Sequence, residues 1–510
     1  MQLRLYNTLS RSVETFEPLE PGHVRIYVCG LTPSAQAHLG HARSFMFFDV
    51  LRRYLVHRGL RVTHVQNVTD IDDRSIATAQ AEGTTYDAVI ARYLASFKSS
   101  MNRLHVLEPD HEPRATAYIP EIVAMIERLV AQGLAYVAAD GVYYAVKKFA
   151  RYGALSHRNV DELMIGARIE PGETKLDPLD FALWKFAKPG EPTWPSPWGD
   201  GRPGWHIECS AMSEALLGVP LDIHGGGFDL IFPHHENEIA QSEPLMPHPP
   251  MSRFWMHGGL LQFDGRKMSK SLGNFEPLAD LLERHDAQAI RLLLMQTGYR
   301  KPMDFTEASI VGATTGLRRL YDAYDALRDA PPAALPANGA DPVPAWRARF
   351  YAALDDDMNT AGAASVLFDV AGASAALVAG AGAAEAAAFL HEAMGILGIS
   401  PNERTLPRRT VQTGSVAVQS GAGGATLVVT GPVDVELPAD IPERLRARLD
   451  SAVSFDGADA RDAIQRVIVA RAEAKANRDY ALADRLRAAL ADAGITLADS
   501  KDGTTWSAAR

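Results

Sequence analysis

The pattern that most limits the fold lies near the start of the chain, where two apolar segments flank an amphipathic one. Residues 24–29 read as a buried strand that ends at Gly30, and residues 61–65 read as a second strand. Between them, apolar residues recur at helical spacing from about His41, and Gly59 is a typical stop signal. A strand, a helix and a second strand in this order imply a parallel sheet, with a ligand site at the carboxyl ends of its strands. We therefore predict an α/β fold.

The rest of the chain divides by composition. With 510 residues, 47% of them hydrophobic, it can bury a large core, and its length suggests about three domains. Residues 331–344 are rich in Pro and Ala, which indicates a linker between a first domain (1–330) and an alanine-rich helical bundle (345–400). Residues 401–440 are rich in Val, Thr, Ser, Gly and Pro, which predicts an irregular or β insert. Residues 441–510 form a small, mainly helical C-terminal region.

Charge and cysteine content exclude several classes of protein. A net charge of -11 argues against indiscriminate nucleic-acid binding, although a local basic face can still contact phosphates. Two cysteines cannot form a disulfide framework, which favours a reducing compartment and leaves the thiols free to bind metal. Residues 1–9 are polar, and we expect no apolar run near the roughly 18 residues that cross a membrane. These features predict a cytoplasmic protein.

Four side chains of metal-binding types form a candidate site: Cys29, Cys209, His234 and Glu238. His234 and Glu238 are four residues apart, so a helix beginning near Pro233 puts both on one face. Together with Cys209 they suit a zinc site that needs one more ligand, and Cys29 is the remaining cysteine of the chain. On spacing alone, two inert buried thiols beside a histidine-rich helix start explain the same residues equally well.

Two local predictions concern the surroundings of this site. Residues 171–204 are rich in Pro and Trp, which predicts an ordered loop packed over the site, including Trp184. After the second strand, Thr69 or Asp70 is a plausible cap for the next helix.

Two further motifs are suited to binding a nucleotide. In residues 38–41 (HLGH), the glycine lets a nucleotide approach the backbone at a helix N-terminus, and the histidines can donate hydrogen bonds to phosphate. Taken alone, two surface histidines at a helix cap explain this motif better. Residues 267–274 (KMSKSLGN) are more specific, because two lysines and two serines in a loop present cations and hydroxyls to a triphosphate. The alternative here is a solvated basic loop.

The two motifs together form the paired signature of class I aminoacyl-tRNA synthetases, and over nearly its full length the sequence resembles a bacterial-type cysteinyl-tRNA synthetase. The matching segments are residues 5–9, 27–30, 67–73, 204–212, 225–241, 267–274, 355–360 and 477–506. The resemblance implies a Rossmann-like catalytic domain with inserted acceptor-end and connective segments, followed by α-helical C-terminal domains. It also implies ATP-dependent ligation of L-cysteine to tRNA(Cys) through cysteinyl-adenylate, by an enzyme that we expect to be a monomer without a membrane partner.

The resemblance assigns roles around the amino acid. It makes the four metal-binding side chains the ligands of one zinc ion, which binds the thiol of the substrate. It places four residues around the amino acid: Thr69, Trp205, His224 and Asp229. For Trp205 and His224, ordinary packing remains an alternative, whereas the carboxylate of Asp229 can pair directly with the substrate ammonium group.

The resemblance also assigns roles around ATP. His38, Gly40 and His41 would hold phosphate and adenylate. Lys270, with Lys267, would neutralise charge as pyrophosphate leaves, on a loop that closes over ATP. The expected catalytic residues are therefore His38, His41, Lys267 and Lys270, and Mg²⁺ would accompany ATP.

The sequence departs from the family pattern in one loop. Residues 31–37 lack a Tyr-Asp pair that the family usually carries, which lowers the expected catalytic efficiency without changing the reaction type. At the other end, the C-terminal region resembles an anticodon-reading region, with Trp506 a candidate for stacking on a base. Arg471, Lys475 and Arg478 have the helical spacing of a basic stripe, for which a solvated helix face is the alternative.

Two other functions share these features. A cysteine ligase of mycothiol synthesis resembles the same catalytic half, but it lacks a tRNA-reading tail such as the one that follows Pro344 here. A non-catalytic paralogue that binds zinc and RNA would explain the altered loop, but the intact lysine motif argues against it.

Overall fold

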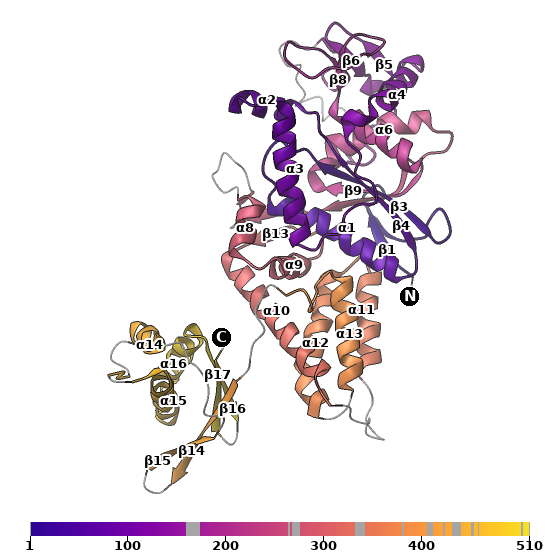
Figure 1. Ribbon diagram of the computed structural model, residues 1–510. Helices are drawn as coiled ribbons and strands as arrows, with labels where there is room; N and C mark the ends of the chain where they lie inside the picture. Colours follow the sequence, from indigo (N-terminus) through magenta and orange to yellow (C-terminus); the bar gives the residue numbers. More distant parts are fainter. Residues whose placement is uncertain are drawn as a thin grey trace. The chain divides into compact units, whose positions relative to one another are not determined.

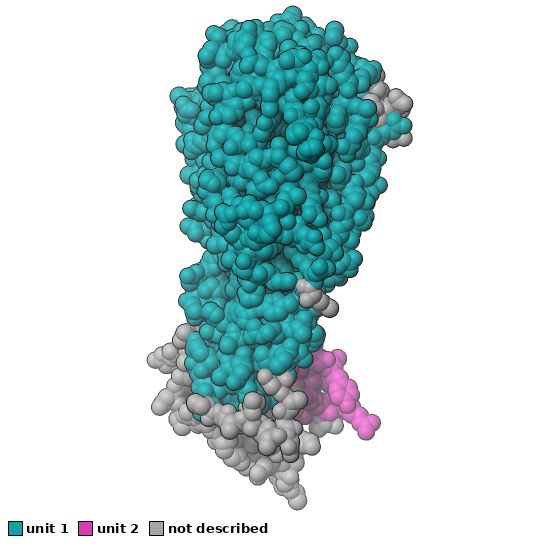
Figure 2. Space-filling view, turned by 90° about the vertical axis from the view of Figure 1, so that its right-hand side faces the viewer, with its two compact units in different colours: residues 1–406 teal, residues 407–510 magenta. Residues whose placement is uncertain are grey.

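The computed structural model describes residues 2–159, 174–263, 266–267, 276–331, 342–379, 382–404, 412–421, 424–430, 440–449, 453–456, 458–500 and 503–508. The chain forms two compact units, Met1–Leu406 and Pro407–Arg510, which are coloured separately in Figure 2.

A parallel sheet of four strands organises the first unit (Figure 1). Its strand order is β10-β9-β3-β4, and each strand is parallel to its neighbours. Helix α1 (Leu39–His57) connects β3 to β4, so the predicted strand–helix–strand unit and the α/β fold are confirmed. The strands are β3 (His23–Leu31), β4 (Arg61–Val68), β9 (Leu221–Gly227) and β10 (Ser252–Gly258).

Helix α1 forms where the sequence pattern places it. Its apolar stripe includes Phe45, Phe48 and Leu51, all buried, and this stripe packs into the core of the unit. The helix ends before Gly59, whose φ of +81° lies in the left-handed region that favours glycine.

A second, antiparallel sheet is inserted between β4 and β9, with α4 (Ile119–Ala131) packed against it. The predicted loop over residues 171–204 is interrupted by two strands of this sheet, which occupy 9 of its 31 described residues. Trp184 is fully buried in the core of the sheet and does not cover a site from outside. In sheet order the strands are β5 (Ala135–Val137), β6 (Gly141–Tyr144), β7 (Phe181–Phe186) and β8 (Gly201–Pro203).

Two long helices, α2 (Asp73–Glu82) and α3 (Tyr86–Arg103), follow β4. The cap of α2 corrects the sequence prediction: Asp72 is the N-cap, and its carboxylate accepts a hydrogen bond from the backbone N–H of Arg74 at 2.8 Å. Asp70 instead accepts hydrogen bonds from the backbone N–H and the hydroxyl of Thr116. Thr69 is therefore not used as a helix cap.

A helical bundle completes the first unit. Helix α10 packs directly against α9, α12 and α13, so parts of the predicted first domain and the predicted bundle share one core. Most of the predicted linker at 331–344 lies outside the described residues. The bundle helices are α9 (Ala287–Met295), α10 (Glu307–Arg328), α11 (Val343–Asp355), α12 (Thr360–Ala379) and α13 (Ala383–Ile396).

Helix α12 corrects the expectation that no apolar run reaches membrane-spanning length. It has 20 residues and a mean hydropathy of 1.6, which is sufficient by length and composition. It packs against α10, α11 and α13, with Val366, Leu367 and Val370 buried in their common core. Because the core helix of a bundle passes the same test, α12 is weak evidence for a membrane span.

The second unit combines a four-stranded antiparallel sheet with three helices. Strand β14 pairs with β15 on one side and with β17 on the other, so the predicted insert (401–440) and the C-terminal region (441–510) build one sheet together. Arg471, which we expected on an exposed basic stripe, is only 4% exposed and cannot contribute to such a stripe. The elements are β14 (Gln412–Gly421), β15 (Gly424–Thr430), α14 (Ile441–Leu449), α15 (Ala460–Ala476), α16 (Tyr480–Asp492), β16 (Ile495–Ser500) and β17 (Gly503–Ala508).

Candidate active site

Side chains of metal-binding types gather at the carboxyl end of the central sheet. Cys29 comes from the end of β3, and Cys209 from α6 (Trp205–Leu217). His234 lies in a helical turn (Ile231–His235), and Glu238 in α7 (Glu236–Ser242). One ligand atom of each side chain lies within 4.8 Å of the others, and all four are buried. The fold thus brings the four predicted metal ligands together.

The distances within this cluster are close to those around a tetrahedral ion, with the His234–Glu238 pair slightly shorter. The sulfur of Cys29 lies 3.6 Å from the sulfur of Cys209 and 3.4 Å from Oε1 of Glu238. Nε2 of His234 lies 3.1 Å from the same carboxylate oxygen. Tetrahedral zinc, with bonds of about 2.0–2.3 Å, separates neighbouring ligand atoms by roughly 3.3–3.8 Å. The sulfur separation is far beyond a disulfide bond, and both thiols are free.

A second set of donors overlaps the first, and the sequence analysis missed part of it. His224 and His235 join Cys29 and Glu238 in a group whose ligand atoms also lie within 4.8 Å of one another. Nε2 of His235 lies 3.3 Å from the sulfur of Cys29, and Nε2 of His224 lies 3.4 Å from Oε1 of Glu238. The adjacent pair His234-His235 is the signal that could have revealed this set.

Hydrogen bonds between imidazoles hold the two histidines of that pair in place. Nδ1 of His234 lies 3.0 Å from Nδ1 of His206. Nδ1 of His235 lies 2.8 Å from Nε2 of His257, whose other ring nitrogen lies 2.8 Å from the hydroxyl of Thr8. Each ring therefore turns Nε2 towards the cluster, which is how ligand histidines are oriented in metal sites.

The electrostatics of the cluster favour the anionic forms of Glu238 and Cys209, whereas burial and the neighbouring Cys209 and Glu238 raise the pKa of Cys29. Burial raises the pKa of Glu238, but His224 and His234 outweigh it and lower the pKa to about 2. Burial likewise opposes ionisation of Cys209, yet hydrogen bonds from Cys29 and His234 lower the pKa of this thiol. For His234, the charge of Glu238 overcomes burial and raises the pKa to about 10. Buried anions need a positive partner, and a bound cation can take over this role from a protonated histidine.

Two of the four predicted amino-acid contacts, His224 and Trp205, lie against the cluster. The ring of His224 stacks on Tyr27, with centroids 5.2 Å apart, and its Nε2 lies 3.6 Å from the sulfur of Cys29. The ring of Trp205 stacks on that of His234 at 4.5 Å. Buried Thr69 follows β4 directly. Packing and a role in binding are thus compatible for Trp205 and His224.

Asn67 links Thr69 to the metal-binding strand, and the sequence analysis did not single it out. The side-chain oxygen of Asn67, Oδ1, accepts a hydrogen bond from the backbone N–H of Gly30, the residue after Cys29, at 2.9 Å. Its amide nitrogen lies 3.3 Å from the hydroxyl oxygen of Thr69, to which it donates. A side chain at Gly30 would collide with the backbone of Asn67, so the two strands approach closely here.

Asp229, the fourth predicted contact, lies apart from the buried cluster. It is exposed in the turn Phe228–Leu230 after β9, and its charge acts on His38. The structure thus places Asp229 towards the histidine motif that we assigned to the nucleotide.

The histidine motif forms the N-terminus of α1. The backbone N–H of Gly40 donates to Nδ1 of His38 at 3.0 Å, and the backbone N–H of His38 donates to Nδ1 of His41 at 3.2 Å. Burial, reinforced for His41 by His38, lowers the pKa of both rings, that of His41 to about 3. Because Nδ1 accepts in both neutral rings, Nε2 carries the proton and becomes the donor that a phosphate oxygen requires. At Gly40, a Cβ atom would lie only 2.8 Å from the ring of His38, which explains the glycine.

The lysine motif and the divergent loop differ in how much of them is described. Lys270 lies outside the described residues. Lys267 belongs to strand β12 (Arg266–Lys267), and its backbone pairs with that of Gln262 on the neighbouring strand. The loop at residues 31–37 is held from several sides, and the carbonyl of Ala37 accepts a hydrogen bond from the backbone N–H of Leu278 at 2.8 Å.

Comparison with known families covers nearly the whole chain. Residues 15–315 match the model of the class I (C) tRNA synthetase catalytic domain, and residues 349–400 match the DALR domain. Cysteine–tRNA ligases from Alkalilimnicola ehrlichii, Pseudomonas aeruginosa (strain LESB58) and Geobacter sulfurreducens are 47%, 45% and 42% identical to this chain. Each match covers 99% of both chains, so it includes the C-terminal tail that the mycothiol alternative lacks.

Solved structures show the same fold at low sequence identity. A methionyl-tRNA synthetase from Mycobacterium tuberculosis in complex with methionyl-adenylate has a TM-score of 0.54 and 16% identity, covering 74% of this chain and 89% of its own. Arginyl-tRNA synthetase from Thermus thermophilus has a TM-score of 0.51 and 14% identity, covering 78% and 85%. These likenesses support the Rossmann-like catalytic fold.

Proposed function

The chain belongs to the cysteine–tRNA ligase family of class I aminoacyl-tRNA synthetases, and we propose that a zinc ion held by Cys29, Cys209, His234 and Glu238 selects its amino acid. The protein joins cysteine to tRNA(Cys) at the expense of ATP. Cysteine and serine differ mainly in sulfur against oxygen, and a pocket that measures size alone separates such molecules weakly. When bound, zinc would add an affinity for thiolate that a hydroxyl does not match.

Of the two overlapping donor sets, we assign the metal to the one that contains Cys209. Both sets contain the carboxylate of Glu238, but this set adds two sulfur ligands and one imidazole, which compensate the charge of a divalent ion better than one sulfur and two neutral imidazoles. The lowered pKa of Cys209 supports its binding as thiolate. His224 and His235 would then shape the wall of the amino-acid pocket, next to Cys29.

The remaining residues would position the reactants. Thr69 and Trp205 would hold the amino acid, and Asp229 its ammonium group. The Nε2–H groups of His38 and His41 would donate to the phosphates of ATP, with Mg²⁺, while the cysteine carboxylate attacks the α-phosphorus. Pyrophosphate leaves, neutralised by Lys267 and Lys270, and a terminal ribose hydroxyl of the tRNA then takes the acyl group from cysteinyl-adenylate.

Zinc analysis of two matched variants tests the metal assignment. Purified wild-type protein should contain about one zinc per chain, and Cys209→Ser should lose it. His235→Asn, which changes the alternative donor set, should retain the ion. Wild-type protein without zinc would refute the proposal, whereas loss of zinc in His235→Asn and its retention in Cys209→Ser would move the metal to the second set.

A second experiment separates activation of cysteine from transfer to tRNA. Lys270→Ala should nearly abolish cysteine-dependent pyrophosphate exchange and keep its zinc, while Lys188→Ala, in an exposed turn, should behave as wild type. Truncation after Leu406 removes the second unit without cutting the bundle core, and we expect it to spare exchange but impair charging of tRNA(Cys). Unimpaired charging by the truncated protein would show that the second unit has another role.

We also propose that the protein is a cytoplasmic monomer. Sedimentation of the purified chain, with and without tRNA(Cys), tests the oligomeric state, and a stable dimer would contradict the proposal.

A further inference from the structure

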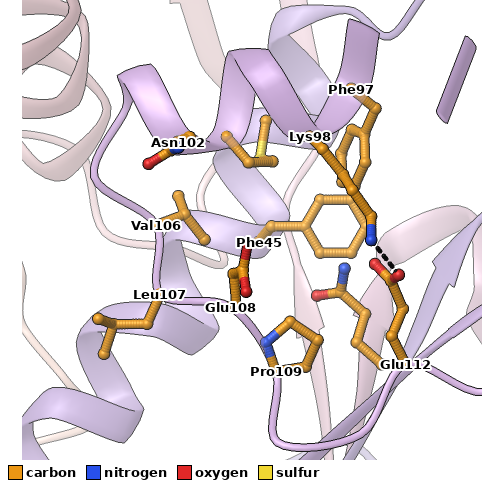
Figure 3. A pocket seen from close by; sticks show the side chains of 11 residues that line it. Phe45, Phe97, Lys98, Asn102, Val106, Leu107, Glu108, Pro109 and Glu112 are labelled. Atoms are coloured by element: carbon orange, nitrogen blue, oxygen red, sulfur yellow. Dashed lines mark ion pairs between the residues drawn. The ribbon is translucent and has the colours of Figure 1, made fainter. Parts of the chain in front are cut away.

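A cavity of about 90 Å³ lies on the side of β4 that faces α1 and α3 (Figure 3). It is lined by α1, β4, α3 and the segment of residues 106–112, and it shares no residue with the metal cluster or the histidine motif. The lining residues that carry the argument are Phe45, Gln66, Phe97, Lys98, Met101 and Glu112.

Most of the cavity wall is apolar. The rings of Phe45 and Phe97 meet edge to face, with centroids 5.2 Å apart, and both side chains are buried. Met101 lies on the same wall, and a thioether adapts well to the outline of a planar ring. The volume exceeds the roughly 30 Å³ share of one water molecule, and a planar ring that enters the cavity would displace water from its apolar wall.

One side chain of the wall is polar, buried and without a hydrogen-bond partner. Gln66 is 8% exposed, and its amide group makes no hydrogen bond with any residue that the structure describes. Its backbone N–H, by contrast, is satisfied by the carbonyl of His111 at 3.0 Å. The amide atoms of Gln66 remain accessible from the cavity, so a ligand that supplies both a donor and an acceptor can take the place of water on this group.

The wall carries one ion pair and, at its exposed edge, the additional carboxylate of Glu108. Lys98 forms an ion pair with Glu112, drawn as a dashed line in Figure 3. A ligand with a net charge would have to compete with this pair, whereas a neutral ligand leaves it intact.

We propose that this cavity is a second small-molecule site, which takes a neutral ring compound bearing an amide-like donor and acceptor. The ring packs between Phe45, Phe97 and Met101, and its polar group pairs with the amide of Gln66. The site is independent of cysteine, ATP and the proposed zinc site.

Ligand titration of the full chain tests this site, with benzamide as the probe and toluene as its apolar counterpart. The observable is the NMR signal of the Met101 methyl group, labelled with ¹³C, measured with and without a non-hydrolysable cysteinyl-adenylate analogue. We expect a saturable shift with benzamide at a Kd on the order of millimolar, as is usual for a ligand of this size. The absence of a saturable shift, or displacement of benzamide by the analogue, would overturn the proposal.

Two variants test the contacts separately. Gln66→Leu should weaken the binding of benzamide by about threefold to tenfold, which is the contribution of a neutral hydrogen bond. The binding of toluene should not weaken. Gln132→Leu, which changes an exposed amide at the end of α4, should alter neither. Equal affinities of wild type and Gln66→Leu for benzamide would refute the role of Gln66. Should Gln66→Leu fail to fold, Val106→Phe, which fills the half-buried rim, must abolish binding of both probes, and retained binding would overturn the site.

Discussion

Two clusters of buried charge in the first unit serve different purposes. In one, Arg291 of α9 is fully buried and donates to the carboxylate of Asp49 in α1. Its other nitrogens donate to the carbonyls of Leu397 at 2.6 Å and Leu104 at 2.9 Å. Asp49 also accepts hydrogen bonds from Arg53 at 3.0 Å and from the backbone N–H of Leu107 at 2.9 Å. Donors and acceptors match, so this cluster needs nothing from outside.

The metal-binding cluster does not balance in this way. Oε2 of Glu238 and Nδ1 of His224 are buried without a hydrogen-bond partner among the described residues. Two thiols and a carboxylate share the space with His234, the one histidine whose pKa is raised there. In the Arg291–Asp49 cluster, donors and acceptors are matched and connect helices of the fold. In the metal-binding cluster, acceptors are in excess, which suits the binding of a cation.

The largest effect should come from breaking the closed cluster. Arg291→Met leaves the Asp49 carboxylate buried without its main partner, and we expect the free energy of unfolding to fall by about 3–5 kcal/mol. Denaturant titration measures this change. The zinc content of the folded protein should not alter, and a loss below about 1 kcal/mol would mean that the pair contributes little.

Replacing both partners is the matched control. Asp49→Leu combined with Arg291→Met removes the charges together, and this variant should be more stable than Arg291→Met alone. Equal stabilities of the two variants would contradict our account of the pair.

Lowering the pH should also weaken the stabilisation by the Asp49–Arg291 pair, with a smaller effect than the substitution. Burial raises the pKa of Asp49, but Arg291 and Arg53 outweigh it, so the folded-state pKa lies below the ordinary value. The stabilisation is therefore complete above the ordinary pKa of an aspartate, about 3.9, and is lost as the pH falls through the folded-state value. The difference in unfolding free energy between wild type and the double variant should narrow in this window. If the difference in unfolding free energy between the two proteins did not depend on pH, the role of the Asp49 charge would be contradicted.

A substitution in the metal-binding cluster should reduce the affinity of the protein for zinc. Glu238→Gln keeps the shape and removes the negative charge, and we expect zinc affinity to fall about a hundredfold, or about 2.7 kcal/mol. Competition with a chromogenic chelator measures the affinity. The metal-free protein should also lose stability, because the variant removes the negative charge that His224 and His234 stabilise in the folded state. Unchanged zinc affinity would exclude Glu238 as a ligand.

The smallest effect should come from Asn67, which ties Gly30 to Thr69. Asn67→Ala removes two neutral hydrogen bonds, and we expect the KM for cysteine in pyrophosphate exchange to rise about threefold to tenfold with zinc retained. Asn102→Ala, at the exposed end of α3, is the control and should leave KM unchanged. A lower kcat at constant KM would instead place Asn67 in the chemical step.

Much of this architecture could be predicted from local sequence patterns. The strand–helix–strand unit was predictable because its apolar residues follow one period in each element, and the spacing of His234 and Glu238 placed both on one helical segment. Family resemblance, not spacing, supplied the roles of Thr69, Trp205 and His224.

Other features depend on contacts that no local pattern records. Residues 171–204 contain two short strands whose pairing partners lie elsewhere in the chain. The first unit continues to Leu406 because α10 packs against α12 and α13. His235 was missed because two adjacent histidines look equivalent in sequence, and the fold alone turns both towards Cys29 and Glu238.

The pairing of β14 with β17 has a consequence for how the protein is made. On the ribosome, the first unit can fold as soon as it has emerged, since its core uses no later residue. The hairpin of β14 and β15 must instead wait with an open edge until β17 has been synthesised. Completion of this sheet therefore waits for the synthesis of β17, and until then the open edge of β14 can pair with another chain.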